Sequence, residues 1–231
     1  MNFKKVTPSA LKSQRLGQCV DHLVSLKKGE SSPLIHKELV FPYSEMVVAA
    51  NKDNIVIEIA SGFRSFDRQL AIFNNKFTGK TDIKDKDNNI VDITTLSELE
   101  VLHAILLYSA LPGASRHHWG CDIDVYAPNL LSSDETLQLE PWEYEENGPM
   151  YKLNVWLNNY AGDFGFYRPY KTYQGGVAAE PWHLSYKPIA DIYEQSFDIT
   201  TLEECIENST IKAKKTILEN LPLISKRYIQ L

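Results

Sequence analysis

The sequence predicts an α+β fold, with a small and mainly antiparallel sheet flanked by helices. Two features of the sequence support this. The segments that resemble strands are short and far apart, and they do not alternate with helices in the regular rhythm of a parallel sheet. Helical stretches occupy both ends of the 231-residue chain. Because no repeat or low-complexity linker divides the chain, we expect residues 1–231 to form a single domain.

The first third of the chain is expected to contain two helices and a strand. A helix is predicted over residues 8–26, with Pro8 at its start, because proline is favoured in the first helical turn. A second, short helix is predicted over residues 42–51. Residues 55–60 are rich in isoleucine and valine and are followed by Gly62, which is typical of a strand that ends in a turn.

Two further helices are expected in the middle of the chain. Ser65 opens the first, which runs to residue 77 and has its apolar side chains on one face: Phe66, Leu70 and Phe73. Residues 78–89 are polar and predict a loop. The second helix covers residues 96–111, because the Pro112-Gly113 pair that follows is a stop signal.

The pattern then changes to a period of two. Residues 120–126 predict a strand that carries Asp122 and Asp124 on one face and apolar side chains on the other. Residues 180–186 predict another strand. Helices are expected over residues 153–160, 189–196 and 201–219.

Composition limits the classes of function. The net charge of −6 argues against broad nucleic-acid binding, which usually needs a basic surface. No run of 18 apolar residues occurs, so we expect no membrane span. No secretory signal follows Lys4 and Lys5, so the chain is expected in the cytoplasm as written, or outside it if a signal has been removed. We also expect a monomer.

Two separated segments carry residues suited to catalysis: residues 115–124, with the sequence SRHHWGCDID, and residues 180–183, with the sequence EPWH. They supply two imidazoles and a carboxylate from His117, His183 and Asp124, which zinc accepts with a fourth position left for water. Glu180, three residues before His183, supplies a base for that water. We expect His117 on the approach to one strand and His183 on its neighbour.

These segments resemble the VanY-like D-alanyl-D-alanine carboxypeptidases and dipeptidases, which share a fold group with lysostaphin-type peptidases and the hedgehog domain. The family pattern is Ser-x-His, a glycine, an aspartate and a distant Glu-x-Trp-His, matched here by Ser115, His117, Gly120, Asp124, Glu180, Trp182 and His183. The family also has an upstream Ser-Gly-aromatic-Arg-Ser segment, which is residues 61–65 here, and Gln69 fits the helix that follows. The resemblance spans about residues 55–187.

The resemblance implies a zinc metallopeptidase that hydrolyses short peptides of the peptidoglycan type, with a D-alanyl-D-alanine carboxypeptidase or dipeptidase as the expected activity. It implies three zinc ligands and a residue that acts as general base and acid: His117, Asp124, His183 and, as the base, Glu180. It implies that Arg64 stabilises the oxyanion, since an arginine carries a permanent charge. The expected substrate-binding residues are Ser115, Trp182, Gln69 and Asp122.

Asp122 departs from the family, which usually has a small residue two positions before the aspartate ligand. Because Asp122 shares a strand face with Asp124, it either bonds a ligand histidine or recognises a substrate amine. The second role would change the substrate class. His118, beside a proposed ligand, is interpreted as a histidine that packs or that supports a ligand through a hydrogen bond, and Cys121 is interpreted as a packing residue.

Two other functions compete with this hypothesis. One is a zinc-stabilised module that binds peptides without catalysis, which would need neither Glu180 nor Arg64. The other is an endopeptidase with the same zinc chemistry, a choice that depends on how the loops at 78–95 and 127–150 close the cleft. Residues 164–170 are interpreted as core and turn, or as a peptide groove in which Tyr167, Arg168 or Tyr170 meets a substrate carboxylate.

Overall fold

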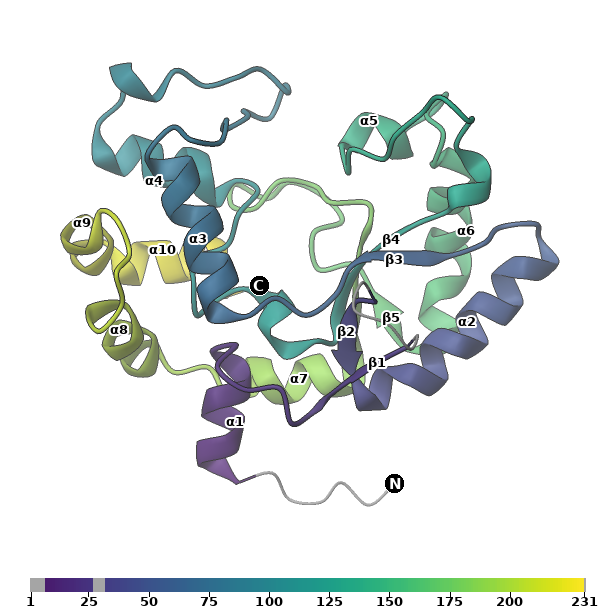
Figure 1. Ribbon diagram of the computed structural model, residues 1–231, viewed down its shortest axis with the longest axis horizontal. Coiled ribbons are helices and arrows are strands. Elements are labelled where there is room, and N and C mark those ends of the chain that lie inside the picture. The colour runs from purple at the N-terminus through teal and green to yellow at the C-terminus, as the bar shows by residue number, and fades with distance from the viewer. Residues whose placement is uncertain (1–6, 27–31, 231) are drawn as a thin grey trace.

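The structure, a computed structural model, describes residues 7–26 and 32–230. It confirms the predicted α+β class (Figure 1). The helices are α1 Pro8–Arg15, α2 Val40–Lys52, α3 Phe66–Phe77, α4 Glu98–Leu106, α5 Pro141–Tyr144, α6 Tyr151–Tyr160, α7 Lys187–Gln195, α8 Ile199–Glu207, α9 Lys214–Glu219 and α10 Leu221–Tyr228. The strands are β1 Leu23–Ser25, β2 Leu34–His36, β3 Glu58–Ser61, β4 Asp122–Tyr126, β5 Phe166–Tyr167 and β6 His183–Tyr186. None of the helices in the described ranges is long and apolar enough to cross a bilayer.

The main sheet has four strands in the order β3-β4-β6-β5, and every neighbouring pair is antiparallel. Its register sets opposite each other the residues that matter for the site. Asp124 lies opposite His183 on β6 and opposite Ser61 on β3. Directly opposed residues project from the same face of a sheet, so the side chains of these residues share one face.

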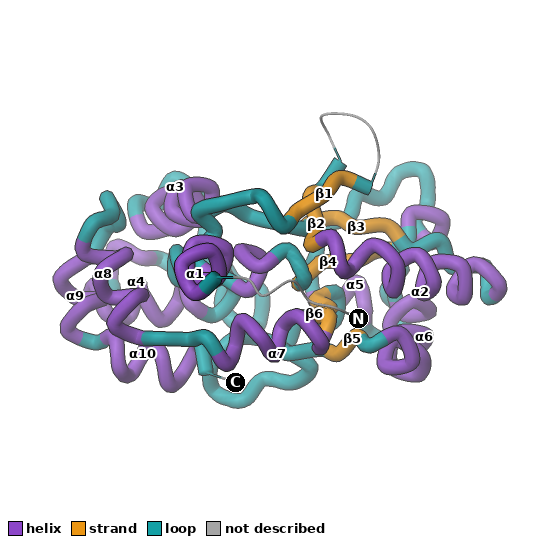
Figure 2. The backbone as a smooth tube through the Cα atoms, turned by 90° about the horizontal axis from the view of Figure 1, so that it is seen from below, coloured by secondary structure: helices purple, strands orange, loops and turns teal. Residues whose placement is uncertain are grey.

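The sheet lies in the middle of the molecule, between two groups of helices (Figures 1 and 2). On one side, α2 and α6 cover its apolar face, and the buried core there includes Met46, Ile57, Ile123, Val125, Trp156 and Leu184. On the other side, α3 and α4 pack with α8, α9 and α10 around a separate core that includes Phe73, Leu102, Ile105, Ile206, Ile217 and Ile224. The polar face of β4 is therefore turned away from the first core.

The helix predicted over residues 8–26 is wrong beyond Arg15. Gly17 has a φ of +71°, the left-handed conformation that commonly ends a helix. The chain then forms β1, which pairs with β2 in a separate two-stranded sheet. Strands of three residues are too short to show an alternating pattern, so β1 and β2 were not predictable from the sequence.

The helix predicted over residues 201–219 is also wrong, because it is two helices. Asn208 caps α8, and Ala213 takes a left-handed φ of +51° before α9 begins. The helix predicted over 96–111 already ends at Leu106, and α5, β5 and α10 were not predicted. The remaining predicted helices and strands are confirmed within a few residues at their ends.

Gly120 supports the turn that leads into β4. It has a φ of +71°, and a Cβ atom at this position would overlap the Leu23 side chain and lie 3.0 Å from the His36 nitrogen. We expect Gly120→Ala to lower the free energy of unfolding by about 1–3 kcal/mol, measured by urea denaturation.

Gly162→Ala is the matched control, because a Cβ atom there meets nothing within 4 Å and its φ is not left-handed. Its effect should stay within about 0.5 kcal/mol. Equal stability of the two variants would contradict the role assigned to Gly120.

Candidate active site

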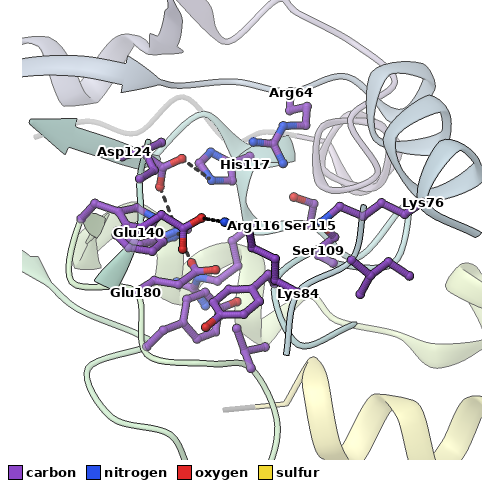
Figure 3. A pocket seen from close by; sticks show the side chains of 18 of the residues that line it. Arg64, Lys76, Lys84, Ser109, Ser115, Arg116, His117, Asp124, Glu140 and Glu180 are labelled. Carbon is purple, nitrogen blue, oxygen red and sulfur yellow. Dashed lines mark hydrogen bonds and ion pairs between the residues drawn. The ribbon is translucent and has the colours of Figure 1, made fainter. Parts of the chain in front are cut away.

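Three segments bring His117, Asp124 and His183 together. His117 lies on the 3-10 helix Arg116–Trp119, Asp124 on β4 and His183 at the start of β6. One ligand atom from each residue lies within 4.8 Å of the others, and all three side chains are buried. Figure 3 shows Asp124 and His117 at one end of a cleft, with Glu180 beside them. The structure thus brings together the three predicted metal ligands.

A hydrogen bond to the backbone of Gly62 fixes the orientation of the His117 ring. Its Nδ1 lies 2.9 Å from the carbonyl oxygen of Gly62, and its Nε2 lies 3.3 Å from Asp124 Oδ2. A carbonyl oxygen only accepts hydrogen bonds, so Nδ1 carries the proton and donates it. The lone pair of Nε2 therefore points toward Asp124, which is the arrangement that a metal ligand needs.

His183 is held in the same way by a carboxylate. Its Nε2 lies 2.9 Å from Asp122 Oδ1, so Nε2 donates and the lone pair remains on Nδ1. That Nδ1 lies 3.3 Å from Asp124 Oδ1. Burial opposes protonation of His183, but the carboxylates of Asp122, Asp124 and Glu180 outweigh burial and raise its pKa. The same concentration of negative charge attracts a metal cation, with which the proton would compete.

The polar atoms of the cluster are incompletely satisfied. Asp124 Oδ1 and His183 Nδ1 are both buried, and neither makes a hydrogen bond. Burial opposes ionisation of Asp124, yet the neighbouring histidines hold its pKa well below the usual range. A buried carboxylate oxygen and a buried imidazole nitrogen that lack hydrogen bonds are costly. A cation bound between them would remove that cost, so the residues present fit a metal site.

Glu180 reaches the cluster without belonging to its ligand group. Its Oε2 lies 3.2 Å from His183 Nδ1, and its backbone nitrogen donates to the carbonyl of Tyr170. The Tyr170 ring also packs on the imidazole of His183, with 5.1 Å between the ring centroids. Glu180 and Tyr170 both line the cleft. A second carboxylate thus lies beside the three candidate ligands and faces the cleft.

Arg64 lies across the cleft from Glu180. Its side chain donates to Gln69 Oε1 at 3.0 Å and to Ser61 Oγ at 3.3 Å, and its backbone nitrogen donates to the carbonyl of His117. Within the described ranges no carboxylate forms an ion pair with Arg64. Burial lowers the pKa of the guanidinium, while the charges of Asp124 and Glu180 oppose that shift. Arg64 is therefore a cation aimed at the cleft and still available to a ligand.

Of the predicted substrate-binding residues, Ser115 and Trp182 line the cleft. Gln69 and Asp122 do not line it, so direct contact with substrate does not fit their positions. Gln69 is fully buried behind Arg64 and donates to the carbonyl of Ala110 at 2.7 Å. Asp122 is fully buried behind His183. We propose that both residues position catalytic side chains.

Arg116, which was not predicted as a site residue, anchors Asp122. Its Nε donates to Asp122 Oδ1 at 2.7 Å, and its other nitrogens donate to Glu194, Tyr167 and Ser185. Although burial opposes ionisation of Asp122, the charge of Arg116 and the bond with His183 keep its pKa below the usual range. The partners of Arg116 are scattered along the sequence, so no local pattern could have revealed this network.

His118 is a packing residue, as expected. Its Nε2 accepts from the Gly113 nitrogen at 3.0 Å, so its Nδ1 carries the proton and donates to the Arg64 carbonyl at 2.6 Å. Burial lowers its pKa to about 3, which keeps the ring neutral. His118 therefore supports the segment that carries Arg64.

Comparison with known proteins adds a family to this geometry. The family model described as VanY, D-alanyl-D-alanine carboxypeptidase, matches residues 32–189, which is more than half of the chain. The chain belongs to the VanY family. This confirms the resemblance seen in the sequence and places the chain among peptidases of the hydrolase class.

Curated relatives in the VanY family differ in length and description. An uncharacterized protein of Haemophilus influenzae is 36% identical over 121 residues, which cover 52% of this chain and 92% of that protein. A D-alanyl-D-alanine carboxypeptidase of Enterococcus faecalis is 28% identical over 163 residues, which cover 68% of this chain and 51% of that protein. The chain thus spans about half the length of the carboxypeptidase that it matches.

Solved VanY structures share the fold. VanYB in complex with D-alanine-D-alanine has a TM-score of 0.53 and 23% identity, with 84% of this chain and 92% of that chain covered. A variant of a vancomycin-resistance D,D-pentapeptidase VanY in complex with Zn(II) has a TM-score of 0.51 and 21% identity, with coverage of 77% and 88%. At these identities the likeness establishes the architecture.

The role of Asp122 can be tested through metal affinity. We expect Asp122→Asn to weaken binding of Zn(II) by about 10- to 100-fold, because the imidazole of His183 loses the charged partner that orients it. Competition with a chromogenic chelator measures the affinity.

Asp191→Asn is the control, since Asp191 pairs with Lys187 on α7 and does not touch the ligand cluster. The control variant should keep the affinity of the unmodified chain. An Asp122→Asn protein that binds Zn(II) equally well would rule out this positioning role.

Proposed function

We propose that the chain is a zinc-dependent peptidase that releases D-alanine from short peptidoglycan-type peptides ending in D-alanyl-D-alanine, as a carboxypeptidase or a dipeptidase. The observation that carries this proposal is the convergence of two imidazoles of fixed tautomer and one carboxylate beside Glu180 (Figure 3). Membership of the VanY family supports the substrate class.

The donor set fits zinc, which favours nitrogen and oxygen ligands in a four-coordinate site. His117 Nε2, Asp124 and His183 Nδ1 would hold the ion. Two neutral imidazoles and one carboxylate leave a unit of positive charge on a Zn²⁺ complex. When bound, zinc supplies a Lewis acid for the scissile carbonyl and lowers the pKa of a bound water toward about 7.

Glu180 moves the proton in this proposal. Its carboxylate accepts a proton from the attacking water and then donates it to the nitrogen of the leaving amine, so Glu180 ends the reaction ionised as it began. The bond between the carbonyl carbon and the leaving nitrogen breaks, and the new bond between that carbon and the water oxygen remains. The position of Glu180, beside the ligands but outside the ligand group, supports this role.

Arg64 stabilises the charge that develops on the carbonyl oxygen. Its guanidinium donates hydrogen bonds that strengthen as that oxygen becomes negative, which lowers the barrier more than it strengthens substrate binding. Gln69 and Ser61 hold the guanidinium in place, and the site is preorganised in consequence.

The size of the cleft supports a short substrate. Its volume is ≈ 280 Å³, just below the range of about 300–1,000 Å³ found for small-molecule sites. A peptidoglycan endopeptidase would need room for chain on both sides of the scissile bond. A peptide-binding module without catalysis would have no use for Glu180 and Arg64 in these positions, which favours the enzyme.

Glu180→Gln tests the assignment of the base. We expect the variant to retain Zn(II) and to lose at least about 100-fold in kcat, since the amide cannot accept the water proton. Mass spectrometry of D-alanine released from a muropeptide or a D,D-dipeptide measures the turnover, and metal analysis confirms loading. Near-normal turnover in the zinc-loaded variant would refute the role of Glu180.

Arg64→Lys separates geometry from charge at the oxyanion position. A lysine keeps the charge but lacks the planar fork that Gln69 and Ser61 hold. We expect kcat to fall by about 10²–10³-fold with a smaller change in KM. A change confined to KM would show instead that Arg64 acts in ground-state binding.

A further inference from the structure

The end of the cleft away from the metal ligands carries a lysine that has no acidic partner. Lys76 lies on α3 seven residues after Gln69, so the two side chains fall on the same face of the helix. Its ammonium points into the cleft toward Ser115 and Ser109 (Figure 3). Lys76 is half-buried, and its Nζ donates to Ser109 Oγ at 2.7 Å.

No carboxylate in the described ranges forms an ion pair with Lys76. Lys84, the other lysine that lines the cleft, is paired with Glu140 and is therefore neutralised. Burial and the neighbouring charge of Arg64 both lower the pKa of Lys76. An ammonium that is partly desolvated beside a second unpaired cation is unfavourable without an anion.

Ser109 adds a hydroxyl donor beside the ammonium of Lys76. Its hydroxyl oxygen accepts from Lys76, which leaves the hydroxyl proton free to donate, and no hydrogen bond donated by this hydroxyl is found among residues 7–26 and 32–230. Ser109 is buried and lines the cleft. Lys76 and Ser109 together offer two donors and a positive charge, which matches the two oxygens of a carboxylate.

We propose that Lys76 and Ser109 bind the C-terminal carboxylate of the substrate. The inference rests on the proposed peptidase function and deepens it. In a peptide whose last bond is cleaved, the terminal carboxylate is attached to the Cα next to the leaving nitrogen, so it must lie close to Glu180 and Arg64. Lys76 lines the same cleft as Glu180 and Arg64, and its side chain extends toward Ser115 in the segment that carries His117.

This assignment separates a carboxypeptidase or dipeptidase from an endopeptidase. A cation that pairs with the terminal carboxylate requires the chain to end one residue beyond the scissile bond, which excludes an endopeptidase. Arg168, considered above for a substrate carboxylate, donates to Asn154 and Asn158 on α6 and does not line the cleft. The carboxylate role therefore falls to Lys76.

The test compares a short peptide that ends in D-Ala-D-Ala as the free acid with the same peptide as a C-terminal amide. We expect kcat/KM of the unmodified enzyme to favour the acid by about 10- to 100-fold, the value of a charge-assisted hydrogen bond. Lys76→Met should abolish most of this preference by slowing hydrolysis of the acid alone. Lys76→Arg, which keeps the charge, should restore part of it.

Lys80→Met is the matched control, because Lys80 is exposed just beyond α3 and does not line the cleft. It should leave the preference for the acid unchanged.

A third peptide, amidated at the C-terminus and carrying a D-glutamate side chain at its last residue, tests whether Lys76 binds a side-chain carboxylate instead. Hydrolysis of this peptide at the rate of the free acid would overturn the C-terminal assignment.

Hydrolysis assays together with calorimetric binding of the peptides separate failure of this inference from failure of the proposed function. Equal hydrolysis of acid and amide, or an unchanged preference in Lys76→Met, overturns the carboxylate site and leaves the peptidase standing. If the zinc-loaded enzyme hydrolyses neither peptide, the proposed function fails. The carboxylate site is then tested by calorimetry of peptide binding to the Glu180→Gln variant. The acid must bind more tightly than the amide when Lys76 is present, and this difference must disappear when Lys76→Met is added.

Discussion

The pairing register of β4 and β6 is the constraint on which the site depends. It sets Asp124 opposite His183 and Asp122 opposite Ser185, so that all four side chains project from one face of the sheet. The intervening Ile123 is fully buried in the core with α2 and α6. A slip of one residue would bury the carboxylates in that core and expose the apolar side chains. Core packing therefore fixes the geometry of the ligand cluster.

Behind the ligands, a buried network holds the charges in place. Asp122 accepts from Arg116, His183 and Ser185, and Arg116 reaches on to Tyr167 and Glu194. Removing one partner of such a buried ion pair costs about 3–5 kcal/mol, because the other charge is left uncompensated. The network is thus better understood as a device for orienting His183 than as a source of stability.

The residues of the candidate site were largely predictable from the sequence because their spacing is local to two segments and one upstream turn. His117, Asp124, His183, Glu180 and Arg64 meet at one cleft, as the motifs predicted. For Asp122 the sequence left two roles open, a bond to a ligand histidine or recognition of a substrate amine, and the structure shows the bond to His183. The position of Gln69 behind Arg64 was not predictable, since helical periodicity gives the face of a side chain but not what lies in front of it.

Several residues that line the cleft could not be predicted from the sequence, because they belong to loops or to no recognised motif. Lys84 and Glu140 come from the two loops that could not be placed, and Lys76 with Ser109 belongs to no motif. Short elements were missed for a similar reason. Strands of two or three residues, such as β1, β2 and β5, carry no periodic signal, and α9 depends on a left-handed Ala213 that propensity does not favour.

X-ray absorption spectroscopy at the zinc edge of the loaded protein tests whether His117, Asp124 and His183 hold the ion. We expect one zinc per chain, with scattering from two imidazoles and with nitrogen and oxygen neighbours at about 2.0–2.2 Å. A sulfur neighbour at about 2.3 Å, or the absence of imidazole scattering, would show that the ion is held elsewhere.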